Sequence, residues 1–228
     1  LRELRRRSTT SQRVNIAATN ENIHDINKFM ARVSSGKLIL TDQITETLNS
    51  GDPNLPVFVF YLHCLSDGPY YEGYSGYTSS YDYFLDIIRR IKYHVVAGDY
   101  SAFPLILVKP HPNLLTGRSS GFAHDLEKED YDIRLSTQLL ENIFSLYSNV
   151  SLLDTRIMSS SLHCHPNIIT VTHHGSVGFE SLCMCRTTLC SQVAPYAGLA
   201  LGESIVYPNY DELPDHLVNK FSSSSSSY

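Results

Sequence analysis

Residues 57–62 read Val-Phe-Val-Phe-Tyr-Leu, an unbroken run of apolar and β-prone side chains. A strand with apolar residues at every position is typical of a parallel sheet whose two faces are both covered. Four later segments have the same character, at residues 105–108, 150–153, 168–171 and 187–189. Apolar residues recur at helical spacing in the segments at 83–91, 139–146, 176–184 and 210–221. This alternation predicts an α/β fold with right-handed βαβ crossovers, a doubly wound parallel sheet of the Rossmann-like kind.

The composition divides the chain into three parts. Residues 1–56 are polar with weak helical periodicity and end in Gly51-Asp52-Pro53-Asn54, so we expect a helical extension and a linker. Residues 57–221 carry the alternating pattern and are expected to form one domain. Residues 222–228 are a serine-rich, low-complexity tail.

The overall composition restricts the class of protein. With 42% hydrophobic and 18% charged residues, the 228-residue chain can bury a substantial core. A net charge of −5 argues against a nucleic-acid binder, whose surface is usually basic. Five arginines within the first 13 residues indicate either a solvated or disordered end or a peripheral contact with an anionic membrane. Five cysteines do not form a disulfide framework and no apolar run is long enough to span a bilayer, so we expect a cytoplasmic protein.

The first chemically informative turn is Lys109-Pro110-His111-Pro112, which follows a predicted strand. The prolines cannot donate to a strand ladder, so the strand ends there and the histidine sits on a stiff turn. Histidine can donate to a phosphate oxygen, and lysine adds a positive charge. The alternative is a strand-ending turn with a surface histidine.

The second turn is His173-His174-Gly175-Ser176-Val177-Gly178-Phe179-Glu180, which also follows a predicted strand. Gly175 and Gly178 would permit positive φ and a close approach of the backbone to a ligand. Ser176 would cap the next helix and offer its hydroxyl to an anion, because free N–H groups at a helix start suit phosphate. Glu180, one turn later on the same face, would accept hydrogen bonds from ribose or sugar hydroxyls. The alternative is a capped helix whose glutamate complements the dipole.

Other motifs are less specific. His63 and Asp67 follow the strand at 57–62 and would meet a ligand or a second domain at the same edge of the sheet, or be a structural histidine and a turn aspartate. No histidine or cysteine spacing matches a known metal centre, so neither a metal nor another cofactor is expected. The sequence contains no G-x-S-x-G elbow, no P-loop, and no GxGxxG after the first strand.

With these two turns the chain resembles the bacterial capsule polysaccharide biosynthesis proteins, GT-B-type glycosyltransferases that include the Kdo transferases of capsule export. The likeness rests on Lys109-Pro110-His111-Pro112 and on His174-Gly175-Ser176-Val177-Gly178-Phe179-Glu180-Ser181-Leu182. The strand at 57–62, with His63, Ser66 and Asp67 after it, is also similar. The resemblance covers about residues 57–210, which in that family form the C-terminal, donor-binding, Rossmann-like domain.

The resemblance implies a donor site in which His111 and Ser176 hold the phosphate of an activated sugar. Gly175 and Gly178 would admit the phosphate, Lys109 and His174 would adjoin it, and Glu180 would bind ribose or sugar. A CMP-linked donor and a polysaccharide or glycolipid acceptor are expected, at the cytoplasmic face of the plasma membrane. GT-B enzymes have two such halves, and we expect this chain to lack the half that usually carries the catalytic base.

Two alternatives to this reading remain open. The chain would be a CDP-polyol phosphotransferase of the teichoic-acid type, or a truncated nucleotide-binding domain without catalytic activity.

Overall fold

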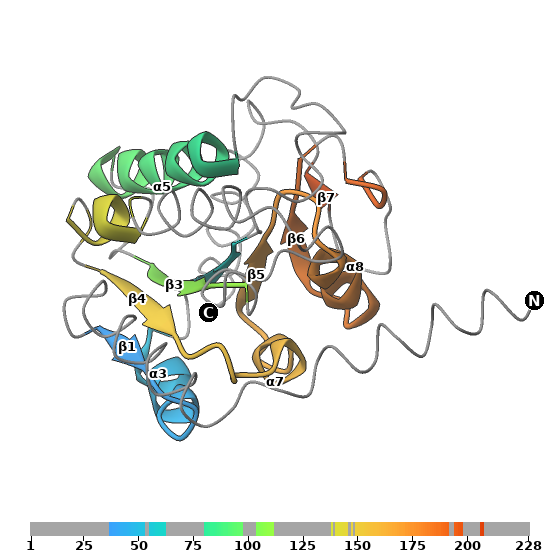
Figure 1. The fold of residues 1–228 in the computed structure, drawn as a ribbon, viewed down its shortest axis with the longest axis horizontal. Coiled ribbons are helices and arrows are strands. Elements are labelled where there is room, and N and C mark those ends of the chain that lie inside the picture. The colour runs from blue at the N-terminus through green and yellow to red at the C-terminus, as the bar shows by residue number, and fades with distance from the viewer. Residues whose placement is uncertain are drawn as a thin grey trace, which may run out of the picture.

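Within the part of the chain that the structure describes, the fold is a seven-stranded, all-parallel sheet with helices on both faces (Figure 1). The computed structural model describes residues 37–52, 55–62, 80–97, 104–111, 138, 140–145, 147, 149–191, 194–197 and 206–207. The strands are β1 (Leu38–Ile39), β2 (Val57–Tyr61), β3 (Leu105–Lys109), β4 (Val150–Leu153), β5 (Ile168–Val171), β6 (Thr187–Leu189) and β7 (Val206–Tyr207). The helices are α3 (Ile44–Ser50), α5 (Ser80–Ala97), α7 (Ser159–His163) and α8 (Ser176–Cys183). Residues 138 and 140–145 are also helical.

The order of strands across the sheet is β1-β4-β3-β2-β5-β6-β7. If β1 is set aside and the remaining strands are numbered from β2 in chain order, their order across the sheet is 3-2-1-4-5-6. This is the order of dinucleotide-binding folds. The order therefore reverses between β2 and β5, whose residues pair directly from Val57 with Ile168 to Phe60 with Val171. This arrangement confirms the predicted doubly wound, Rossmann-like sheet.

The two faces of the sheet bury two separate sets of side chains. In β2, Phe58 and Phe60 point to the face covered by α5 and by the helix at 140–145. Val57, Val59 and Tyr61 alternate with them and point to the face covered by α3 and α7. Figure 1 shows α5 on one side of the sheet and α3 and α7 on the other. Because both faces are covered, every residue of β2 must be apolar or aromatic, which is the pattern that the sequence displays.

Helix α5 forms because its apolar residues recur at helical spacing and cover the sheet. Phe84, Ile87, Ile88 and Ile91 are all buried against β2 and β3. On a more exposed part of the helix, Arg90 Nε donates to Asp86 Oδ2 at 2.8 Å, an i,i+4 ion pair. The predicted apolar stripe is thus confirmed, over a longer helix than the stripe alone indicated.

The sheet begins earlier in the chain than we predicted. Residues 37–52 were expected to belong to a polar helical extension, but β1 pairs with β4 from Leu38 to Leu152 and from Ile39 to Leu153. Ile44 and Leu48 of α3 are buried in the same core as β2. The boundary at residue 57 was wrong in this respect, because a two-residue strand leaves no periodic signal and gains its pairing from β4.

Three expected features lie outside the described residues: the weak helical periodicity before residue 37, the closing helix at 210–221 and the tail at 222–228. Within the described ranges, none of the helices is long and apolar enough to cross a membrane.

Candidate ligand-binding site

A pocket of about 510 Å³ opens at the carboxyl ends of the central strands. Its lining comes from the segments after β2, β3, β4 and β5, the strands on either side of the reversal in strand order. Ligands of open α/β sheets bind at such a reversal, because the loops that follow the two strands run to opposite faces and leave a crevice. The pocket therefore lies where this fold is expected to bind a ligand.

Five of the predicted site residues line this one pocket. Lys109 and His111 reach it from the turn after β3, and Gly175, Ser176 and Glu180 reach it from the start of α8. The two turns are more than sixty residues apart in the sequence. The other two residues assigned to the donor site, His174 and Gly178, do not line the pocket.

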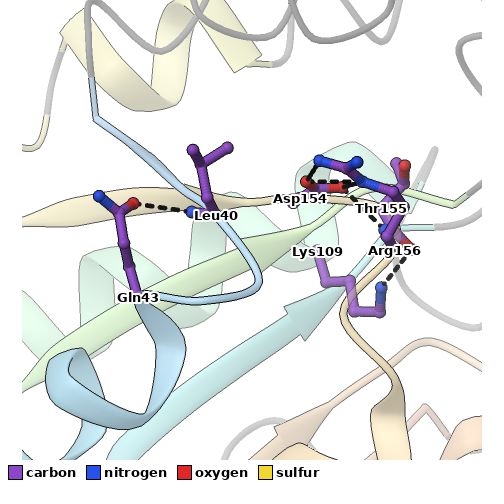
Figure 2. Close-up of polar contacts among 6 residues, drawn as sticks. All are labelled: Leu40, Gln43, Lys109, Asp154, Thr155 and Arg156. Carbon is purple, nitrogen blue, oxygen red and sulfur yellow. Dashed lines mark hydrogen bonds and ion pairs between the residues drawn. The ribbon is translucent and has the colours of Figure 1, made fainter. Parts of the chain in front are cut away.

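One side of the pocket, which we call the charged wall, consists of Lys109, Thr155 and Arg156, with Asp154 behind them (Figure 2). Lys109 is the last residue of β3, and its Nζ donates to the backbone oxygen of Thr155 at 3.1 Å. Only 7% of Lys109 is exposed. Burial lowers the pKa of its ammonium group to about 8, although the charge of Asp154 acts in the opposite direction. The lysine is therefore charged at neutral pH, but only narrowly.

Asp154 holds the charged wall together from behind. Its carboxylate is fully buried and accepts the backbone N–H of Arg156 at 2.9 Å and the Nε–H of the same arginine. Arg156 Nη2 also pairs with Asp154 Oδ2. Burial alone would raise the pKa of Asp154, but the hydrogen bonds from Arg156 and the charges of Arg156 and Lys109 hold it below its ordinary value. The carboxylate is thus ionised and fixed at neutral pH.

A second set of lining residues, which we call the helical wall, consists of Gly175, Ser176 and Glu180, and Tyr196 bonds to the first of them. Gly175 is the N-cap of α8, and Ser176 is the first helical residue. No side chain caps the helix, so the predicted capping role of Ser176 was wrong. Neither the Ser176 hydroxyl nor the first N–H groups of α8 are therefore engaged in a side-chain cap. Glu180, one helical turn after Ser176, lines the same pocket.

Neither Gly175 nor Gly178 has the role that we predicted for it. Gly175 has φ −66° and ψ 149°, an extended conformation that other residues also adopt. Gly178 is buried within α8, where a Cβ would lie 2.3 Å from the Tyr196 hydroxyl. The close approach that requires Gly178 is therefore to the Tyr196 ring rather than to a ligand. Tyr196 in turn donates its hydroxyl to the Gly175 oxygen at 2.6 Å and so ties the turn before α8 to the segment after β6.

The two histidines of the second turn pack behind the helical wall. Their Nδ1 atoms lie 2.8 Å apart, so one ring donates to the other, and the rings meet edge to face. His173 is only 1% exposed, and the Ser191 hydroxyl lies 3.5 Å from its Nδ1. Burial, with a smaller contribution from the charge of His174, lowers the pKa of His173 to about 4. His173 is thus a neutral, structural histidine at physiological pH.

Tyr61, at the end of β2, adjoins a buried polar cluster beneath the pocket. Its hydroxyl lies 3.3 Å from His163 Nε2, and the same nitrogen lies 3.2 Å from the Thr170 hydroxyl. Burial raises the pKa of Tyr61, and burial with the charge of Arg186 lowers the pKa of His163 to about 4. Both groups are therefore neutral, and proton transfer from the phenol to the imidazole is unfavourable.

Sequence reasoning missed the segment after β4. Arg156, Ser159 and Ser160 all line the pocket, and Asp154 positions the first of them. The available signal was Asp154-Thr155-Arg156 directly after a predicted strand. His63 and Asp67, predicted for the same edge of the sheet, lie outside the described residues. Among the residues that the structure describes, no three histidine, cysteine or acidic side chains gather closely enough to hold a metal ion.

A scan of protein-family models and a search of curated proteins each found no match to this sequence. The fold and the pocket are therefore the observations on which a function must be argued.

Proposed function

We propose that the pocket binds the phosphate of a nucleotide-activated sugar, and that the domain is the donor-binding half of a GT-B-type glycosyltransferase. One observation carries the proposal. Two polar turns that are distant in sequence, one ending in His111 and the other containing Ser176, line a single pocket at the reversal in strand order. The resemblance of the same two turns to the capsule polysaccharide enzymes supports the choice of sugar transfer, with a CMP-linked donor.

The pocket residues suit the departure of a nucleotide. As the bond from sugar to phosphate breaks, negative charge builds on the phosphate, and donors fixed in advance stabilise that charge. His111, the Ser176 hydroxyl and the first N–H groups of α8 would supply such donors, and Lys109 would add a positive charge. Glu180 would accept hydrogen bonds from ribose or sugar hydroxyls at the same wall. We assign no catalytic base to this chain, because in GT-B enzymes that group usually comes from the other half.

The proposed setting is the synthesis of a capsule or other surface polysaccharide. The acceptor would be a polysaccharide or glycolipid, and the protein would work in the cytoplasm, peripherally on the inner face of the plasma membrane.

Calorimetric titration of the full chain with CMP, UMP and CDP tests the binding proposal. His111→Ala and Ser176→Ala are each expected to weaken nucleotide binding by about 1–3 kcal/mol, as for a lost hydrogen bond to a charged group. Ser145→Ala is the matched control, because Ser145 is an exposed serine on the helix at 140–145, on the α5 face of the sheet. Unchanged affinity in both pocket variants would refute the site.

A donor survey separates the proposed reaction from its rivals. The chain is incubated with CMP-Kdo, CMP-sialic acid, UDP-sugars and CDP-glycerol. The incubation is done with the chain alone and with the chain joined to the other half of the proposed GT-B enzyme. Release of CMP from a CMP-sugar supports sugar transfer. Turnover of CDP-glycerol alone would point to polyol phosphate transfer, and nucleotide binding without any turnover would point to a non-catalytic domain.

A further inference from the structure

We propose that Arg156 is a second anion-binding group of the pocket that Ser176 also lines, and that Asp154 is the residue that positions it. The inference rests on the proposed function, since it takes the ligand of the pocket to carry a phosphate. The predicted site residues follow β3 and β5, and none of them follows β4. The assignment of Arg156 therefore adds the segment after β4 to the site.

The guanidinium of Arg156 is fixed before any ligand binds. Asp154 accepts its Nε–H at 3.0 Å and 2.9 Å through the two carboxylate oxygens, pairs with Nη2, and also accepts the backbone N–H of the same residue. Figure 2 shows the side chain folded back onto Asp154 at the end of β4. A long side chain held in one rotamer loses little further entropy when it binds a ligand.

The arrangement leaves donors for a ligand. A guanidinium carries five N–H groups, and Asp154 engages those on Nε and one side of Nη2. The remaining N–H groups on Nη1 and Nη2 have no acceptor among the residues that the structure describes. About half of the Arg156 side chain is exposed, and the residue lines the pocket. A planar group with several adjacent N–H donors matches the oxygens of a phosphate.

The carboxylates in and around the pocket offset part of its positive charge, so that Lys109 alone leaves little net charge for an anionic ligand. Asp154 offsets one positive charge of the charged wall, and its hydrogen bond and charge are the main cause of the raised pKa of Arg156, with a smaller contribution from Asp42. Glu180 adds a carboxylate to the lining of the pocket. Lys109 is buried and spends one N–H on the Thr155 oxygen. Arg156 would therefore add a second positive charge for an anionic phosphate, beside Lys109 and the start of α8 in the same pocket.

A comparison within the chain separates this pair from an ordinary ion pair. Arg90 and Asp86 form the same kind of contact on α5, but both side chains are about one-third exposed. The Asp154 carboxylate is fully buried, so it cannot move to follow the arginine. Arg90→Gln and Asp86→Asn are therefore matched controls that change the same charges away from the pocket.

The first experiment measures binding of inorganic pyrophosphate and of CMP to the full chain by calorimetry. Arg156→Gln is expected to weaken both about 10- to 100-fold, the loss of a charge-assisted hydrogen bond. Arg156→Lys is expected to fall between that variant and the unmodified chain, because lysine keeps the charge but not the planar fork. Arg90→Gln is expected to leave both affinities unchanged. Thermal unfolding of each variant verifies that it folds.

A second measurement tests the positioning role of Asp154. Asp154→Asn removes a negative charge near the ligand, which by itself would strengthen anion binding. If Asp154 acts by orienting the arginine, Asp154→Asn weakens pyrophosphate binding several-fold in the unmodified chain, and does not weaken it in the Arg156→Gln background. A purely structural or purely electrostatic role would give the same change in both backgrounds, and that result would overturn the positioning assignment.

The outcomes distinguish this inference from the proposed function. If CMP binding depends on Ser176 but not on Arg156, the pocket binds nucleotide and the assignment of Arg156 is wrong. If pyrophosphate binds and depends on Arg156 while CMP does not bind, Arg156 is an anion ligand but the nucleotide-sugar proposal fails. If neither ligand binds the unmodified chain, both proposals fail.

Discussion

The two walls of the pocket are built in different ways. The charged wall depends on side-chain electrostatics, because Lys109 and Arg156 are fixed by the buried carboxylate of Asp154 and by the Thr155 oxygen. The helical wall depends on backbone shape and close contact, because the Tyr196 ring lies directly against Gly178 and its hydroxyl holds the Gly175 oxygen. The first wall supplies positive charge, and the second supplies N–H groups and a hydroxyl.

This difference separates what each wall contributes to binding and to stability. A change on the charged wall alters the charge that a ligand meets, whereas a change on the helical wall alters the position of donors that carry only partial charge. Substitutions that break one wall at a time therefore measure how much each mode of construction contributes.

The largest effect is expected from Asp154→Asn on the charged wall. The substitution removes the carboxylate that bonds Arg156 and opposes the burial cost of Lys109. We expect the free energy of unfolding at pH 7 to fall by about 2–3 kcal/mol, as for lost hydrogen bonds to a buried charged group. Urea denaturation measures it. Glu46→Gln, at an exposed position of α3, is the control and is expected to change stability by less than about 0.5 kcal/mol. A loss no larger than that of the control would mean that the buried carboxylate does not stabilise this wall.

Acid is expected to have the next largest effect, through His173 behind the helical wall. Its pKa is about 4 in the folded protein against an ordinary value of 6.5, so the unfolded chain binds more protons between these values. The contribution of neutral His173 to the free energy of unfolding is therefore fully present above pH 6.5, and it is lost as the pH drops toward 4. The expected loss from this residue is about 2 kcal/mol, less than the full shift implies because partly exposed His174 contributes to it.

His173→Asn tests that assignment, since it should flatten the decline of stability between pH 6.5 and pH 4. His163, whose pKa is also about 4, makes a similar and separate contribution from beneath the pocket. The decline should consequently be reduced but not abolished in the single variant. An unaltered slope would show that His173 is not protonated on unfolding in this range.

The sequence predicted the centre of the fold well and its edges poorly. The strands β2 and β5 are buried at every position, and β3 and β4 at every position but one. Burial on both faces leaves an almost continuous apolar signal that can be recognised in each segment by itself. Strands β1 and β7 have two residues each, so their pairing depends on β4 and β6 rather than on their own sequence. The helix α7 was missed because its five residues, mostly serine, are too few to show a helical pattern of apolar side chains.

The site was predictable to the extent that it follows from strand ends. Polar residues after two predicted strands had to meet at one edge of the sheet, and Lys109, His111 and Ser176 do line one pocket. Arg156 was missed because its role depends on the burial of Asp154, which a local pattern does not reveal. Gly178 was misread because its partner Tyr196 is 18 residues away, and a glycine required by a distant ring resembles one required by a ligand.

Gly178→Ala is expected to destabilise the helical wall by about 1–3 kcal/mol, because its Cβ would overlap the Tyr196 ring and force it to move. Gly51→Ala is the matched control. Gly51 has φ −71°, and a Cβ there would meet only the Leu48 oxygen at 3.8 Å, an ordinary contact. We expect the control to be neutral or slightly stabilising. Equal stability of the two variants in denaturation experiments would mean that the ring yields without cost.

The smallest effect is expected from Tyr196→Phe, which keeps the ring against Gly178 and removes the hydroxyl, with its hydrogen bonds to the Gly175 oxygen and to the Thr172 side chain. A loss of about 1 kcal/mol in the free energy of unfolding is expected for these neutral hydrogen bonds. Exposed Tyr93→Phe is the control. Because the contact between ring and glycine survives, Tyr196→Phe should be milder than Gly178→Ala if close contact is what holds this wall. A larger loss for Tyr196→Phe would reverse that conclusion and make the hydrogen bond, as on the charged wall, the main support.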